Sequence, residues 1–120
     1  MIELLLASLL AVAGQDDAPP TAAARPLTLP QQTSLRCAAA FALVESDRAA
    51  GSASHAGYPE LKVRGKEFFV RTAARVMDET GSTREQVQQM LQGEVAGLSQ
   101  PGRLDEVMPA CLLLLDASGL

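Results

Sequence analysis

The sequence predicts an all-α protein, a compact bundle of about four helices whose first and last helices are joined by a disulfide. Composition is the first reason: 48% of the residues are hydrophobic but only 3% are aromatic, so the apolar mass is mainly Ala, Leu and Val. Ala and Leu are the strongest helix formers, whereas the typical strand formers are scarce. The second reason is that four segments carry apolar residues at helical spacing. The third is the placement of two cysteines, Cys37 and Cys111, in apolar segments towards the two ends of a chain of 120 residues.

Residues 1–13 have the pattern of a signal peptide. The sequence MIELLLASLLAVAG contains an apolar run from Leu4 to Ala13 that is interrupted only by Ser8. Such a run is too short for a membrane-spanning helix but fits the apolar region of an export signal. Small residues suited to cleavage follow at Ala11-Val12-Ala13, and a later site at residues 22–24 places cleavage as late as residue 24. The start, Met1-Ile2-Glu3, lacks the usual positive charge, so a short buried helix is the alternative.

A proline-rich linker is expected over residues 14–32, GQDDAPPTAAARPLTLPQQ. It contains four prolines, which lack a backbone donor and restrict the residue before them. An extended stretch outside the core is therefore expected, followed by a helical domain over residues 33–120. An export signal and such a linker predict a periplasmic or secreted protein with no stable membrane span in its mature form.

The first two helices are expected over residues 33–50 and 60–80. Thr33 or Ser34 can cap the first, and Gly51 can end it. Pro59 suits the first turn of the second, and an interior glycine, Gly65, indicates a close helix crossing. The expected apolar stripes are Cys37, Ala40, Phe41 and Val44 in the first helix, and Leu61, Phe68, Phe69, Ala73, Val76 and Met77 in the second.

The third helix is expected to begin with a capping box, formed either by Ser82 with Glu85 or by Thr83 with Gln86. It should end before the Ser99–Gly102 segment. The fourth helix is expected over residues 104–118, and it is apolar nearly all round, which predicts that it is the central helix. Pro109 should kink or divide it. Their expected buried residues are Val87, Met90, Leu91, Val95 and Leu98 in the third helix, and Leu104, Val107, Met108, Cys111, Leu112 and Leu115 in the fourth.

Cys37 and Cys111 are expected to form a disulfide between the first and fourth helices. An even cysteine count, a small domain and an export signal all favour this pairing, with a Cα–Cα distance of about 4.4–6.8 Å. Two free thiols in the core are the alternative, because unpaired cysteine is often buried. A redox enzyme is not expected, since there is no Cys-x-x-Cys motif and neither thiol has a cationic neighbour at a helix start.

The remaining residues predict no catalytic, cofactor or metal site. A net charge of −4 disfavours nucleic-acid binding. The single histidine, His55, lies in a Gly/Ser/Ala segment and is expected to be solvated, and Ser54-His55 has no acidic residue nearby in sequence to orient it. In the second helix the basic residues are interpreted as i,i+4 pairs, Glu60–Arg64, Glu67–Arg71 and Arg75–Glu79, with an anion-binding stripe as the alternative.

Three stretches, LRCAAAFALV, GKEFFVRTAARVMDETG and MPACLLLLDASGL, resemble a group of small exported helical proteins of alphaproteobacteria. The resemblance covers residues 35–120 and implies a periplasmic location, with no known activity and no catalytic residue. The architecture is also similar to that of the HdeA-type periplasmic acid-stress chaperones, which are short, exported and helical with one disulfide. No local motif of that family is matched, so none of its residue roles is transferred.

These observations predict a non-enzymatic periplasmic protein that binds another protein or an envelope component. The first alternative is an acid-activated chaperone, because 14 acidic residues against 10 basic ones would leave a positive chain once the carboxylates are protonated. The second is a small-ligand carrier with an apolar pocket between the first, second and fourth helices, near Phe41, Phe68 and Phe69. Packing in the core is the simpler interpretation of those three rings.

Overall fold

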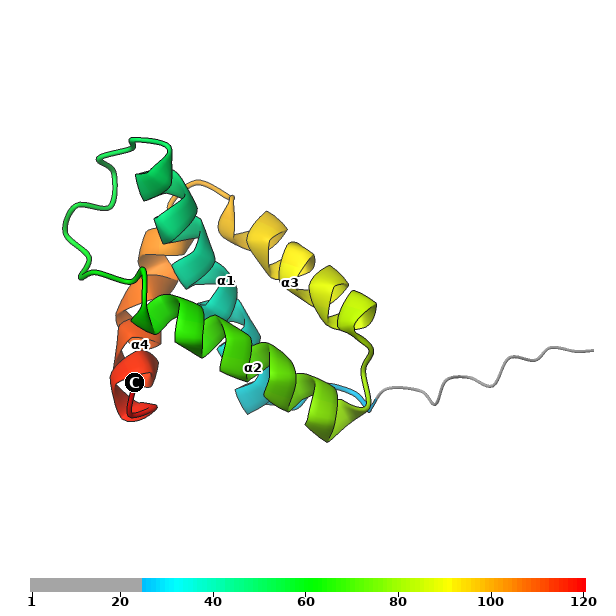
Figure 1. Ribbon diagram of the computed structural model, residues 1–120. Helices are drawn as coiled ribbons and strands as arrows, with labels where there is room; N and C mark the ends of the chain where they lie inside the picture. Colours follow the sequence, from blue (N-terminus) through cyan, green and yellow to red (C-terminus); the bar gives the residue numbers. More distant parts are fainter. Residues whose placement is uncertain (1–24) are drawn as a thin grey trace, which may run out of the picture.

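The computed structural model describes residues 25–120, which form four helices (Figure 1). They are α1 (Leu29–Ala49), α2 (Arg64–Thr80), α3 (Arg84–Leu98) and α4 (Arg103–Ala117). This part of the chain contains no strand, so the predicted all-α class is confirmed. The signal-like segment 1–13 and residues 14–24 of the expected linker lie outside the described residues.

Helix α1 begins four residues earlier than expected, so the prediction that residues 29–32 belong to a linker is wrong. Its cap is Thr28, not Thr33 or Ser34: the Gln31 N–H donates to Thr28 Oγ1 at 3.2 Å, and the Thr28 N–H donates to Gln31 Oε1 at 2.9 Å. Pro30 lies in the first turn, where a helix has no partner for the missing N–H in any case. Gly51, at φ +87°, follows the other end of the helix as expected.

The segment before α1 packs against the end of α2. The Arg25 N–H donates to the Thr80 carbonyl at 3.0 Å, and the Arg25 guanidinium donates to the Glu79 carbonyl at 2.6 Å. Leu27 lies against a cluster of buried residues formed by Leu35, Val76 and Val87. Residues 25–28 are therefore outside any helix, but they are part of the folded domain.

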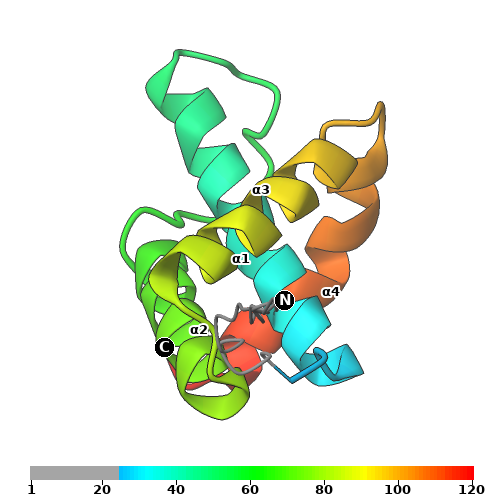
Figure 2. The same cartoon turned by 90° about the vertical axis from the view of Figure 1, so that its right-hand side faces the viewer.

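Helix α1 is the central helix, and the prediction that α4 is central is wrong. Five consecutive residues of α1, Cys37 to Phe41, are at most 1% exposed, and five residues exceed one full turn, so every side of the helix is covered there. The other three helices all pack on α1 (Figures 1 and 2). Leu113 of α4, by contrast, is 72% exposed.

Small side chains explain this arrangement. Ala38, Ala39 and Ala40 are each 0% exposed, and a methyl group lets neighbouring helices approach the α1 backbone closely on all sides. Helix α4 buries one stripe only, formed by Met108, Cys111 and Leu115. Four consecutive leucines necessarily point in all directions around a helix that has neighbours on one side.

Helix α2 begins at Arg64, four residues later than expected, and Pro59 lies in the preceding loop. The Arg48 side chain explains the late start, because it binds the backbone carbonyls of His55, Tyr58 and Pro59 and holds that segment away from a helical path. Leu61 is 0% exposed, but it packs from this loop rather than from the helix. The helix ends at Gly81 in the left-handed conformation, as expected.

Helix α3 begins with one of the two capping boxes expected from the sequence. The Gln86 N–H donates to Thr83 Oγ1 at 3.1 Å, and the Thr83 N–H donates to Gln86 Oε1 at 2.8 Å. Helix α4 continues without interruption through Pro109, so the expected division of this helix is wrong. Pro109 is exposed, and its missing donor leaves one carbonyl, that of Asp105, without its helical partner.

Only one of the three charge pairs expected along the second helix is present, Glu67–Arg71 at 3.6 Å. Arg64 instead reaches the end of α4, where it pairs with Asp116 at 2.9 Å and donates to the Leu120 carbonyl at 2.7 Å. Glu79 accepts a hydrogen bond from Gln31 of α1 at 2.9 Å. These charged side chains therefore connect helices with one another, an arrangement that spacing within one helix does not reveal.

Candidate functional site

The predicted disulfide is present between α1 and α4. Cys37 and Cys111 are 1% and 2% exposed, and their Cα atoms are 5.1 Å apart, within the expected range. The alternative of two free thiols is thereby excluded. The bond closes a separation of 74 residues and fixes the last helix to the central one. It lies in the core, so its role is structural.

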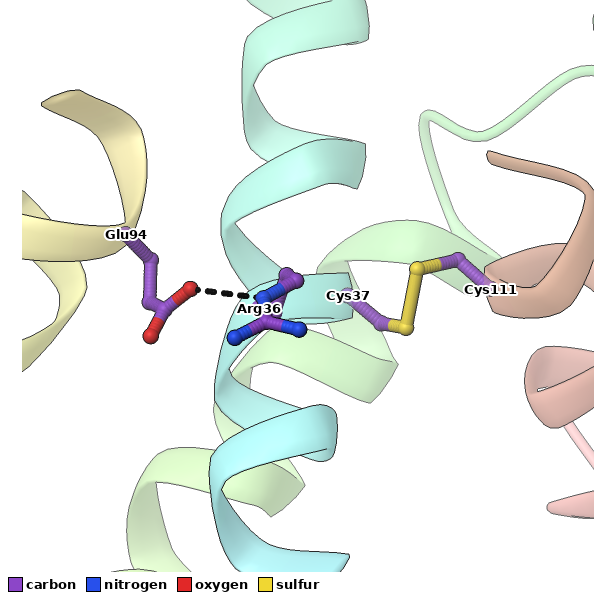
Figure 3. The surroundings of a disulfide bond; sticks show 4 residues. All are labelled: Arg36, Cys37, Glu94 and Cys111. Carbon is purple, nitrogen blue, oxygen red and sulfur yellow. Dashed lines mark hydrogen bonds and ion pairs between the residues drawn. A yellow bond between two sulfur atoms is a disulfide. The ribbon is translucent and has the colours of Figure 1, made fainter. Parts of the chain in front are cut away.

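The residue before Cys37 reaches the opposite side of α1. Arg36 forms an ion pair with Glu94 of α3 at 3.1 Å, whereas Cys37 bonds to α4 (Figure 3). The Arg36 and Glu94 side chains are 31% and 18% exposed, so this ion pair is partly shielded from solvent. One turn of α1 thus carries a covalent link to α4 and a charged link to α3.

His55 is buried, and the expectation of a solvated loop histidine is wrong. Its side chain is 9% exposed, and Nε2 lies 2.7 Å from Asp47 Oδ2. The ring stacks on Tyr58 with a centroid distance of 5.7 Å. Asp47 is eight positions away, near the end of α1. The loop after α1 folds back along the helix and brings the His55 ring to the Asp47 carboxylate. Sequence alone gave no periodic signal for this contact.

The His55 pair does not form a nucleophile and base arrangement. The Ser54 hydroxyl is engaged with the Ser52 hydroxyl at 2.9 Å. His55 Nδ1 has no hydrogen-bond partner among the described residues. The acid that sequence analysis did not find, Asp47, therefore serves to hold the histidine in the loop.

Arg48 organises the same loop from its other side. Its guanidinium donates to the carbonyls of His55 at 2.7 Å, Tyr58 at 2.6 Å and Pro59 at 2.8 Å. It also pairs with Glu45 at 3.3 Å. A planar guanidinium can satisfy several carbonyls at once, which a lysine ammonium cannot do with the same geometry. The long loop between α1 and α2 is therefore fastened to the end of α1.

Tyr58 connects this loop to α4, since its hydroxyl donates to the Asp105 carboxylate. The pKa of Tyr58 is raised to about 12, first because burial disfavours the phenolate, and further because of the hydrogen bond to Asp105 and its negative charge. The hydroxyl is thus protonated at neutral pH and acts as a fixed donor.

An apolar groove lies between α1 and the start of α2, with a volume of about 300 Å³. Its accessible apolar side chains are Phe69, which is half-buried, and Ala42, which is exposed, whereas Phe41 borders the groove from the core and is only 1% exposed. Phe68 does not line it: this ring is 5% exposed and packs edge-on against Phe41 at 5.3 Å. The residues that line this groove are Phe41, Ala42, Glu45, Lys62, Gly65, Lys66 and Phe69.

Two exposed valines continue the apolar surface of the groove along α2. Val63 is 68% exposed and Val70 is 56% exposed, and both line a shallow hollow that shares Lys62 and Lys66 with the groove. We refer to Lys62, Val63, Lys66, Phe69 and Val70 together as the α2 face. The pocket expected near the phenylalanines is thus divided into two. The groove lies between α1 and α2, and a separate hollow of about 320 Å³ lies between α1, α2 and α4, where Phe68 and Leu114 line it.

No cluster of three or more His, Cys, Asp or Glu side chains suited to a metal ion occurs within residues 25–120. Over the same range, none of the four helices combines the length and the apolarity that crossing a membrane requires. Comparisons with protein-family models, with curated proteins and with solved structures give no match to this chain. The groove and the α2 face combine a concave surface with highly exposed apolar side chains, and they form the candidate binding site.

Proposed function

We propose that the protein is an exported, non-enzymatic binding protein that holds the apolar part of another protein, or of an envelope component, at the groove and the α2 face. The observation that carries this proposal is the exposure of Val63 and Val70 directly beside the groove. Four large apolar residues are highly exposed in the described chain, and two of them lie together on this one surface. Adjacent exposed apolar residues beside a concave surface are typical of binding sites.

Export is supported by the buried disulfide, because such bonds form and persist mainly in oxidising compartments. The signal-like segment and the resemblance to exported alphaproteobacterial proteins favour the same location, the periplasm or the outside of the cell. Mass spectrometry of the protein from fractionated cells tests this point. A chain lacking the first 13 to 24 residues in the periplasm is expected, and a chain in the cytoplasm that still begins at Met1 would contradict it.

Site-specific photo-crosslinking tests the binding surface. A photoreactive phenylalanine analogue replaces Val70 on the α2 face, and in a matched control it replaces Leu113 of α4, which is similarly exposed. We expect one dominant crosslinked species from position 70 in intact cells and none from position 113. Equal crosslinking at both positions, or none at position 70, would end the proposal that this face binds a partner.

A second candidate function is an acid-activated chaperone, and one feature favours it. Two of the links between helices are ion pairs with carboxylates, Arg36–Glu94 between α1 and α3 and Arg64–Asp116 between α2 and α4. Ion pairs with carboxylates are in general weakened by strong acid, whereas the disulfide would still hold α4 to α1. Loosening of α3 would then expose core residues such as Val87 and Leu98 without full unfolding.

Suppression of client aggregation separates the two functions. The chaperone hypothesis expects protection of an acid-sensitive client at about pH 2–3, where carboxylates are protonated, and little protection at neutral pH. The binding-protein hypothesis expects crosslinking from Val70 at neutral pH. If the protein gives the client no protection in acid, even at several-fold excess, the chaperone function is excluded.

A further inference from the structure

We propose that the groove takes a single-chain anionic amphiphile, with an acyl chain against Phe69 and Ala42 and a carboxylate head at Lys62 and Lys66. This inference rests on the proposed function and names the chemistry of the envelope component. The pocket volume of about 300 Å³ lies at the small end of the range for ligand sites, which suits one chain rather than two.

The body of the groove is suited to a hydrocarbon chain. The half-buried Phe69 ring and the exposed Ala42 methyl group line it, and Gly65 contributes no side chain there. A Cβ at Gly65 would lie 3.3 Å from the Cβ of Phe41, so the backbone of α2 approaches α1 as closely as packing allows. Alkyl chains need apolar contact without directional bonds, and this surface offers contact of that kind.

The rim of the groove is positively charged. The chain has only two lysines, Lys62 and Lys66, and both line the groove. Neither forms an ion pair with any residue in 25–120. Glu45 also lines the groove, but its carboxylate is paired with Arg48 at 3.3 Å. Two unpaired ammonium groups beside an apolar surface favour a ligand with an apolar body and a negative head.

The start of α2 adds to this positive potential. Val63 precedes the helix and provides no side-chain cap, and of the first amides the Gly65 N–H donates to the Leu61 carbonyl at 2.9 Å. The N-terminal end of a helix carries a partial positive charge. Glu67, the acidic residue of this first turn, is paired with Arg71 at 3.6 Å. The helix end therefore reinforces the two lysines at the same rim.

A set of three ligands with the same chain tests the inference. Binding of decanoate, decanol and decyltrimethylammonium to the oxidised protein is measured by calorimetry at low salt, below the concentration at which each aggregates. Decanoate is expected to bind roughly tenfold more tightly than decanol, because its carboxylate can interact with both ammonium groups, and the cation should bind most weakly. Raising the salt concentration should reduce the preference for decanoate.

Two double variants distinguish the effect of the two lysines at the rim from the effect of the net charge of the protein. Lys62→Gln with Lys66→Gln should reduce the decanoate affinity to that of decanol. Arg75→Gln with Arg84→Gln removes the same charge outside the groove and should leave the preference intact. Equal binding of decanoate and decanol by the unaltered protein, or equal losses in both double variants, would overturn the inference.

A blocking variant tests the location of the chain. Ala42 is exposed and lines the groove, so Ala42→Trp should fill it without disturbing the core and should abolish decanoate binding. Ala49→Trp, on the same helix outside the groove, is the matched control. Unchanged binding in Ala42→Trp would place the ligand elsewhere and overturn the inference. The crosslinking result at Val70 is independent of these ligands, so failure here would leave the proposed function standing.

Discussion

Gly65 of α2 lies directly against Phe41 of α1, and there is no room between them for an ordinary side chain. A Cβ atom built on Gly65 would lie 3.2 Å from the Cβ of Leu61 and 3.3 Å from the Cβ of Phe41. Contacts this short are rare, and Phe41 and Leu61 are both fully buried and cannot easily move. The glycine predicted to mark a close helix crossing does so, although it lies in the first turn of α2 rather than in the middle of a longer helix.

Gly65→Ala is therefore expected to destabilise the protein by about 1–3 kcal/mol, the usual effect of overpacking a core. Gly93→Ala is the matched control, because Gly93 is inside α3 and a Cβ there meets nothing within 4 Å. That substitution should stabilise the protein by up to ~1 kcal/mol through helix propensity. Chemical denaturation of both variants gives the two free energies of unfolding, and equal signs would contradict the crossing argument.

Loss of the disulfide should lower the stability substantially. A bond that closes a separation of 74 residues contributes up to ~4.5 kcal/mol by chain entropy. Each kcal/mol corresponds to roughly 4–8 °C in the melting temperature for a domain of this size. Cys37→Ala, Cys111→Ala and the double substitution should all show similar melting temperatures, near that of the reduced protein. Labelling of two thiols per chain in unfolded, unreduced protein would contradict the bond.

Arg48→Lys should loosen the loop between α1 and α2. Lysine keeps the charge, but its shorter side chain lacks the planar fork with which Arg48 reaches the three carbonyls, so a loss of about 1–3 kcal/mol is expected. Faster amide hydrogen exchange or protease cleavage within residues 50–63 would show the effect directly. In the control Arg103→Lys, an exposed pair with Glu106 is altered, and a change within about 0.5 kcal/mol is expected.

Tyr58 should titrate with a pKa near 12, and it is the only tyrosine in a chain without tryptophan. Its phenolate absorbance can therefore be followed without interference. Because the folded state binds this proton more tightly than the unfolded state, the contribution of Tyr58 to stability is complete below about pH 10. It falls as the pH rises towards 12. Asp105→Asn removes the neighbouring charge and should lower the pKa part of the way to its ordinary value.

Periodicity and capping chemistry were sufficient to predict much of the fold. Thr83 with Gln86 begins α3 as one of the expected boxes, and Gly81 ends α2, because these signals depend on the nearest residues only. The start of α1 was missed, although Thr28 and Gln31 form the same kind of box. The prolines around them suggested a break, but a proline in the first turn is compatible with a helix.

The central helix could not be identified by hydrophobicity. The leucines of α4 are more apolar than the alanines of α1, yet the position between three neighbours requires small side chains. The run Ala38–Ala40 is the sequence feature that fits a central helix. It indicates a central position only where several helices pack around the same turn, which the sequence does not show.

The candidate site was predicted only in part. Phe41 and Phe69 were expected near a pocket, and they line the groove. Burial of His55 and its contact with Asp47 depend on the path of a loop, which has no periodic pattern in sequence. Lys62 and Lys66 are among the basic residues interpreted as a charged helix surface, with an anion-binding stripe as the alternative. Their position beside Phe69 depends on the crossing of α1 and α2, which the sequence does not reveal.

The central position of α1 has a consequence for how the protein is made. Of the four helices in residues 25–120, the one that the others cover is synthesised first, and the cysteine that secures it belongs to the one synthesised last. A nascent chain in which Cys111 has not yet been synthesised carries Cys37 as an unpaired thiol and leaves one side of the alanine run uncovered. The Cys37–Cys111 bond can therefore form only in chains in which α4 has packed against α1. A chain truncated before residue 111 would keep a free Cys37 thiol and would be open to mispairing and proteolysis.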